Sequence, residues 1–166
     1  MLSEKMNGEL NKQINAEMFS SYLYLSMSGW FESKGLSGFA TWMRMQAKEE
    51  TFHAEKIYDY VYERGGRVTL GGIDQPESDW SSALNVFEEA LKHEEMVSGM
   101  INDLVNIAIE EKDHATNNFL QWFVAEQVEE EASAQAVVDK LKLIGDGSGL
   151  FALDQEMGRR TFVEEE

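Results

Sequence analysis

Polar residues interrupt four helical patterns of apolar residues in this chain, and each interruption falls near the middle of its stretch. The clearest pair is Glu50-x-x-His53, because residues three apart on a helix share a face about one turn from each other. A carboxylate and an imidazole placed in this way can bind one metal ion. The other interruptions are three carboxylates and an amide: Glu17, Glu94, Glu130 and Gln127.

The burial of these groups indicates a bound cation. Carboxylates gathered in an apolar core each lose several kcal/mol of hydration unless a positive charge neutralises them. We expect no basic partner, since Lys48 and Lys56 lie on other faces of the same stretch. The chain has no cysteine, so only oxygen and nitrogen ligands remain. Such a set suits Fe(II), Fe(III) or Mn(II), with zinc as a competitor.

Further acidic residues lie beside this candidate centre. Glu49, Glu126 and Glu129 point about 100° away from the apolar faces, so they form either an adjoining acidic site or a solvated surface. The fourth stretch has no second Glu-x-x-His, and its carboxylates take the place of the missing histidine. We therefore expect a second metal position that is bound by oxygen alone, and more weakly.

Several other residues have simpler readings. His93 lies off the apolar face and His114 lies in a turn, so both are predicted to be surface residues that bind no metal. Tyr24 is as consistent with core packing as with a role at the centre. Trp122 is read by default as a core residue. The methionines are typical of core filling.

The elements that carry these residues are predicted to be long helices. Apolar residues recur with a period of about 3.6, and glycines follow three of the four stretches. A single proline, Pro76, also favours a helical chain. The predicted helices run over about 5–33, from Phe39 to the Gly65-Gly66 stop, over 82–110, and from the 112–114 turn to Gly145. A short amphipathic segment follows at about 150–160.

The segment between the second and third helices determines the topology. It runs from Gly65 to about Ser81, and an extended chain of that length spans about 55 Å, more than the roughly 42 Å of a 28-residue helix. The second and third helices are then parallel. The predicted fold class is all-α, a four-helix bundle with a long crossover between helices 2 and 3 and a short C-terminal fifth helix. We see no obvious place in such a bundle for the apolar face of that fifth helix.

Length and charge exclude several classes of protein. The 166 residues predict a single domain, 1–166, and 31 acidic against 14 basic residues give a net charge of −17, which disfavours a nucleic-acid partner. No apolar run is long enough for a membrane helix, and no secretory signal precedes the first helix, so we expect a cytoplasmic protein. The acidic end, Glu164 to Glu166, is read as a solvated tail.

These residues resemble the pattern of the non-haem bacterial ferritins over essentially the whole chain. The resemblance is carried by Glu17, Tyr24, Glu49, Glu50, His53, Glu94, Trp122, Glu126, Gln127, Glu129 and Glu130. Bacterioferritins differ by a second Glu-x-x-His and a haem-binding methionine where this chain has Thr51, so no haem is expected. Rubrerythrins have a Cys-x-x-Cys iron module that this chain lacks.

The resemblance implies two to three iron ions per subunit and a mineral core inside a 24-subunit cage. The implied ligands are Glu17, Glu50 and His53 for the first ion, Glu50, Glu94 and Glu130 for the second, and Glu49, Glu126, Glu129 and Glu130 for the third. Gln127 would lie near the dioxygen position and Tyr24 would hydrogen-bond close to the centre. Together with Glu50 and His53, these two are the implied catalytic residues.

The functional hypothesis is therefore iron storage with ferroxidase activity, in which dioxygen or hydrogen peroxide oxidises Fe(II). An alternative is a non-storing di-iron oxidase or peroxidase of the rubrerythrin-like type, acting at the same site. A second alternative is a structural bundle whose buried acids are ion-paired or protonated. Assembly size separates the first two, and metal content separates the third.

Overall fold

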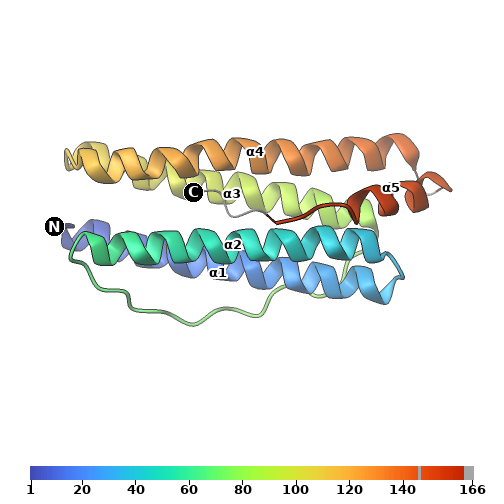
Figure 1. Cartoon of the computed structure of the whole chain (residues 1–166), viewed down its shortest axis with the longest axis horizontal. Helices are drawn as coiled ribbons and strands as arrows, with labels where there is room; N and C mark the ends of the chain where they lie inside the picture. The colour runs from blue at the N-terminus through green and yellow to red at the C-terminus, as the bar shows by residue number, and fades with distance from the viewer. Residues whose placement is uncertain (146, 163–166) are drawn as a thin grey trace.

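The computed structural model describes residues 1–145 and 147–162, and within them the secondary structure consists of five helices. These are α1 (Glu4–Ser33), α2 (Ser37–Glu63), α3 (Ala83–Glu110), α4 (His114–Ile144) and α5 (Gly149–Met157). The first four lie side by side as a bundle, and α5 lies at one end of it (Figure 1). The predicted fold class is confirmed. No helix in this part of the chain is long and apolar enough to cross a membrane. The predicted acidic tail, Glu164 to Glu166, lies outside the described residues.

Local signals account for most helix ends. The side chain of Ser3 accepts a hydrogen bond from the Met6 amide at 2.9 Å, and Ser82 and Asp113 cap α3 and α4 in the same way. Gly65, which follows α2, has a φ of +71°, a conformation that favours glycine. The predicted ends agree closely except for the last, because α5 stops at Met157 rather than at about residue 160.

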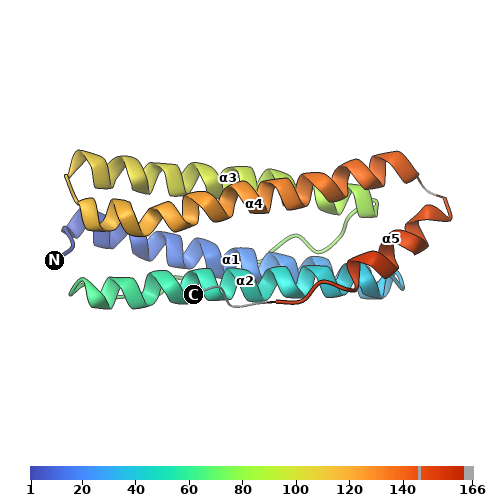
Figure 2. The same cartoon turned by 45° about the horizontal axis from the view of Figure 1, so that its top comes forward.

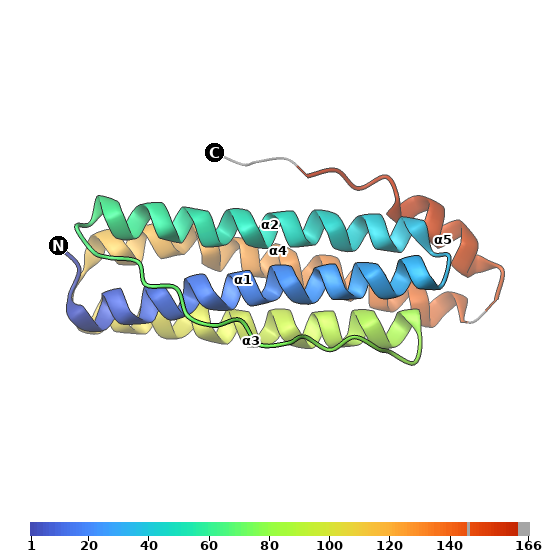
Figure 3. The same cartoon turned by 90° about the horizontal axis from the view of Figure 1, so that it is seen from below.

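Asparagines on α1 hold the crossover between α2 and α3. Asn7, Asn11 and Asn15 are spaced four apart, so they form one row along the helix. The Asn11 amide nitrogen donates to the Arg67 carbonyl at 2.9 Å, and its oxygen accepts from the Thr69 amide at 2.5 Å. The crossover therefore runs back along the bundle, and α2 and α3 are parallel, as predicted (Figure 3).

The fifth helix packs onto the bundle through its apolar face. Leu153 and Met157 are 5% exposed and belong to the same hydrophobic cluster as Phe31 and Phe39. The sequence showed no obvious place for this face within a single bundle, and the structure supplies one. The reason is that α5 turns back across the end of the bundle and covers apolar side chains there (Figure 2). Phe151, at 71% exposure, points away from the bundle.

A side chain of α5 caps the first turn of α2 and fixes the two helices against each other. The residue before α2, Leu36, has no side chain that can cap the helix, and the Asp154 carboxylate accepts the Phe39 amide at 3.0 Å instead. Gly38 permits this approach, because a Cβ on that residue would lie 1.6 Å from the Asp154 carbonyl oxygen. The N-terminal end of α2 and the middle of α5 are thus in direct contact and hydrogen-bonded.

A polar layer divides the core into two apolar clusters. One cluster, at the α5 end, contains Phe31, Phe39 and Phe87, and the other, at the opposite end, contains Leu10 and Ile57. Between them lie buried polar residues from all four long helices: Gln13, Glu17, Ser20, Ser21, Gln46, Glu50, His53, Glu94, Gln127 and Glu130. The two apolar clusters fix the positions of the helices, and so they fix this layer.

One apolar residue of α1 lies outside the core. Leu25 is 48% exposed. The buried face of α1 is instead centred on Tyr24 and Met27, each 1% exposed, because α1 packs against both α2 and α3 and turns Leu25 outward.

Candidate metal centre

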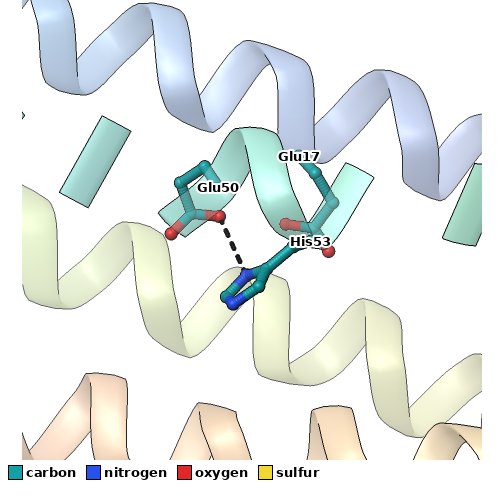
Figure 4. A group of neighbouring side chains, drawn as sticks. All are labelled: Glu17, Glu50 and His53. Carbon is teal, nitrogen blue, oxygen red and sulfur yellow. Dashed lines mark ion pairs between the residues drawn. The ribbon is translucent and has the colours of Figure 1, made fainter. Parts of the chain in front are cut away.

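Glu17, Glu50 and His53 converge in the polar layer. The three side chains are at most 3% exposed, and they offer ligand atoms that all lie within 4.8 Å of one another. Nδ1 of His53 lies 3.5 Å from Oε2 of Glu50, and Glu17 reaches toward them from α1 (Figure 4). Two elements thus bring together two carboxylates and one imidazole, a donor set suited to a divalent metal ion such as iron, manganese or zinc.

One carboxylate oxygen of this group has no partner. Oε1 of Glu17 accepts a hydrogen bond from Gln13 at 2.8 Å, whereas Oε2 is buried and has no hydrogen-bond partner among the described residues. A buried oxygen left in this way carries a free-energy penalty of about 1–3 kcal/mol. A metal ion among Glu17, Glu50 and His53 would remove that penalty, so these residues fit a bound cation.

The second half of the centre is held by hydrogen bonds between helices. Gln46 donates to Oε1 of Glu50 at 3.2 Å and to Oε2 of Glu130 at 2.5 Å. Gln127 donates to Oε2 of Glu94 at 3.1 Å, and the Tyr24 hydroxyl donates to Oε1 of the same residue. The carboxylates from α2, α3 and α4 are therefore held in place before any metal binds.

Two of the residues that orient these ligands, Gln13 and Gln46, were not singled out by the sequence. Gln13 lies four residues before Glu17, and Gln46 lies four residues before Glu50. A glutamine four positions before a glutamate on a helix can donate a hydrogen bond to it, and this spacing is the signal that was available. The further contact of Gln46 with Glu130, 84 residues away, required the folded chain.

Burial raises the pKa of every carboxyl group in the centre. Desolvation is the largest cause for Glu17, Glu50, Glu94 and Glu130, and the neighbouring carboxylates add to it at Glu17, Glu50 and Glu130. The pKa of Glu130 rises to about 8. The metal-free centre therefore retains protons at neutral pH, and a metal ion would have to displace them.

Tyr24 is a buried neutral phenol. Its side chain is 1% exposed, and burial, followed by the charge of Glu94, raises its pKa well above the usual value. Its hydroxyl proton therefore remains available for the hydrogen bond to Glu94. This contact places Tyr24 beside a predicted ligand, as the sequence led us to expect, and leaves its catalytic role a prediction.

An acidic cavity of about 130 Å³ adjoins the centre between α2 and α4. His53, Glu126 and Glu130 line it, and their ligand atoms also lie within 4.8 Å of one another. Glu49 and Glu129 line the same cavity, so all four predicted ligands of a third ion lie around it. His53 was not predicted to face this side.

A basic residue lies at this cavity, contrary to the sequence-based expectation. Arg160, in the segment after α5, forms an ion pair with Glu49. Its distance of 111 residues along the chain explains why the pattern of Lys48 and Lys56 gave no sign of it. The other acids of the centre, Glu17, Glu50 and Glu94, form no ion pair with a lysine or arginine of the described residues.

The two remaining histidines differ from each other. His114 is exposed, as predicted. His93 was predicted to be a surface residue, but it is largely buried, with a ring nitrogen 2.7 Å from Oγ of Ser20, and burial lowers its pKa to about 4. It turns inward because Phe19 and Tyr24 pack against its ring, at centroid distances of 5.9 and 6.0 Å.

Trp122 packs against the candidate centre rather than within it. Its ring meets the His53 ring edge-on at a centroid distance of 5.4 Å, and the Lys56 ammonium lies over the Trp122 ring, 4.4 Å from its centroid. The default reading of Trp122 as a packing residue agrees with this position. Its ring restricts the orientations of the His53 imidazole.

A bundle of four helices with a carboxylate and histidine centre at mid-height defines a class of helical metal-binding protein. The family model of the ferritin-like domain matches residues 7–144. The chain belongs to the ferritin family.

Named relatives agree with this assignment. A bacterial non-heme ferritin of Bacteroides fragilis is 51% identical over 160 residues, which cover 96% of this chain and 100% of the relative. One from Campylobacter jejuni is 45% identical, with 93% of each chain covered. The resemblance stated from the sequence is thereby confirmed.

Solved structures agree as well. The open-pore ferritin of the archaeon Archaeoglobus fulgidus superposes with a TM-score of 0.96 at 54% identity, over 97% of this chain and 99% of that one. An engineered closed form of the same ferritin gives a TM-score of 0.97 at 55% identity, over 98% and 100%.

Proposed function

We propose that this protein stores iron and has ferroxidase activity. Fe(II) is the substrate, and the first two ions bind at the centre of each subunit. Glu17, Glu50 and His53 hold one ion, and Glu50, Glu94 and Glu130 hold the other. The observation that carries the proposal is the convergence of Glu17, Glu50 and His53 around a buried, unpartnered carboxylate oxygen.

The residues supply binding, position and charge. In the reaction, two Fe(II) ions each lose one electron, and dioxygen accepts two electrons and two protons to give hydrogen peroxide. With hydrogen peroxide as the oxidant, the products are two water molecules. Carboxyl groups release their protons when iron binds, and the resulting carboxylates compensate the charge of the iron. Tyr24 and Gln127 hold Glu94 from two sides, so that this ligand keeps its position while the iron charge changes.

The proposal extends to the assembly. Relatives named as ferritins and the net charge of −17 support a cage of 24 copies that concentrates cations and holds a ferric mineral. A third ion would bind in the acidic cavity, at Glu49, Glu126, Glu129 and Glu130. A cytoplasmic location and the absence of haem belong to the same proposal.

A single isosteric substitution tests the centre. Glu17→Gln keeps the side-chain volume and removes one negative ligand, so we expect the initial rate of Fe(II) oxidation to fall about 10- to 100-fold or more. Glu32→Gln is the control, because it makes the same charge change at an exposed position of the same helix. Equal rates for the two variants and the unmodified protein would contradict the assignment.

Iron retention tests storage separately. The protein is loaded aerobically with excess Fe(II) and then passed through a size-exclusion column. We expect a large particle that retains far more iron than the two or three ions per chain that the ligands can hold. A small species with about two iron ions per chain would instead support the non-storing di-iron oxidase.

A further inference from the structure

The segment after α5 folds back along α2 and ends at the acidic cavity. Figure 3 shows this segment turning away from α5 and running beside α2. Arg160 lies at the point where it meets the bundle, and its guanidinium forms an ion pair with Glu49. The side chains of both residues are 20% exposed, so the pair is largely shielded from water.

An aromatic ring holds Arg160 in this position. The guanidinium carbon lies 4.1 Å from the centroid of the Trp42 ring, and Trp42 is itself 8% exposed. A cation over a buried indole face is attracted by the ring as well as by Glu49. Arginine remains charged at every physiological pH, so this position carries a permanent positive charge.

The same cavity contains the group that could hold a third metal ion. Arg160 and Phe162 line it together with Glu49, Glu126, Glu129 and Glu130, and ligand atoms of Glu126 and Glu130 lie within 4.8 Å of each other. One nitrogen of the Arg160 guanidinium, Nη1, is buried and has no hydrogen-bond partner among the described residues. The Arg160 guanidinium and the proposed ligands of the third ion therefore lie in the same cavity of about 130 Å³.

Two cations this close repel each other. In a site shielded from water, like charges a few ångströms apart repel each other more strongly than they would in bulk water. A metal ion bound through Glu49 also requires the carboxylate that Arg160 now occupies. The guanidinium and the third ion therefore cannot both be bound at full strength.

We propose that Arg160 is a built-in competitor of the third metal ion. The guanidinium occupies Glu49 while the cavity holds no metal, and it leaves Glu49 and Trp42 when a cation binds there. The segment of residues 158–162 then detaches, whereas α5 stays in place through Asp154, Leu153 and Met157. This inference rests on the proposed third ion, and it makes that position weaker than the other two and couples its occupancy to the chain terminus.

Metal titration of two neighbouring variants tests the competition. Metal-free protein in its native assembly is titrated with Zn(II), which does not change oxidation state, and the dissociation constant of each successive ion is measured by calorimetry. We expect Arg160→Gln to bind the third ion about three- to tenfold more tightly, with the first two ions unchanged. Arg159→Gln is the matched control, since it removes the same charge from the adjacent, exposed residue.

Hydrogen exchange of the same region gives a second readout. In the unmodified protein, we expect the amides of residues 158–162 to exchange faster after the third equivalent of Zn(II), and not after the first two. In Arg160→Gln they should already exchange fast without metal. If the ion pair were purely structural, Arg160→Gln would exchange fast without metal, but Zn(II) would not accelerate exchange in the unmodified protein. The third dissociation constant would also be the same in both proteins.

The outcomes separate this inference from the proposed function. Equal third-ion affinity in Arg160→Gln and Arg159→Gln overturns the competition, and so does a third ion that leaves the exchange of residues 158–162 unchanged. Binding of only two ions by every variant also overturns it, and leaves the two-ion centre intact. Binding of no ions at all would overturn the proposed function itself.

Discussion

Replacement of Glu130 by glutamine should stabilise the metal-free protein and weaken its response to metal. Glu130 is 7% exposed, and burial raises the pKa of its carboxyl group to about 8. Glutamine has nearly the same shape, and its side-chain oxygen can still accept the hydrogen bond from Gln46. The substitution therefore removes the charge while it preserves the packing.

The sign follows from proton binding. Between about pH 4.5 and pH 8 the folded protein keeps a proton on Glu130 that the unfolded chain has released, so folding takes up a proton and stability falls as pH rises. Each pH unit in that window lowers the free energy of unfolding by about 1.4 kcal/mol, which amounts to about 5 kcal/mol across it. Below the window both states are protonated, and above it both are ionised.

Guanidinium unfolding of the metal-free protein from pH 5 to pH 8.5, with a chelator present, measures this effect. We expect Glu130→Gln to remove the part of the pH slope that Glu130 contributes, about one proton, and to be several kcal/mol more stable than the unmodified protein at pH 8; the buried Glu17, Glu50 and Glu94 keep their own contributions. Glu95→Gln, an exposed change of the same charge, should keep the slope.

Metal should reverse this order. A ligand that binds only the folded state adds to its stability, so saturating Zn(II) should stabilise the unmodified protein more than Glu130→Gln. A Glu130→Gln variant that is less stable than the unmodified protein without metal at pH 8 would refute the reasoning, because burial of the charge would then not be the dominant effect.

Two further predictions concern the joints that hold the elements around the centre. Asp154→Ala removes the only side-chain cap that the described structure gives to α2 and should lower the free energy of unfolding by about 1–2 kcal/mol, measured by denaturant unfolding; Gly38→Ala should lower it further, because the Asp154 carbonyl must move. Asn11→Ala leaves the Thr69 amide to water and leaves the Arg67 carbonyl only its 3.3 Å hydrogen bond from Asn7, so exchange of the Thr69 amide should accelerate with a stability loss of about 1 kcal/mol. The exposed control Asn106→Ala should change neither.

Local spacing along the chain was enough to predict the helices and the height of the polar layer. A helix repeats every 3.6 residues, so the residues that share a face are set by local spacing alone. Glu50 and His53 lie on one face for that reason, and Glu17, Glu94 and Glu130 fall near the midpoints of helices of similar length. The length of the crossover then allowed α2 and α3 to be parallel.

Only the tertiary structure decided which partners these residues have. Gln46 meets Glu130, Asp154 caps α2, and Arg160 reaches Glu49 across separations of 84 to 115 residues. Such contacts depend on the rotation of each helix about its axis and on the path of the chain after α5, which no local period specifies. His93 shows the same limit, because aromatic rings from α1 turn it inward although its own helical position predicts the surface. Local spacing therefore sets the helical face on which a side chain lies, and packing between distant segments sets which residues it contacts.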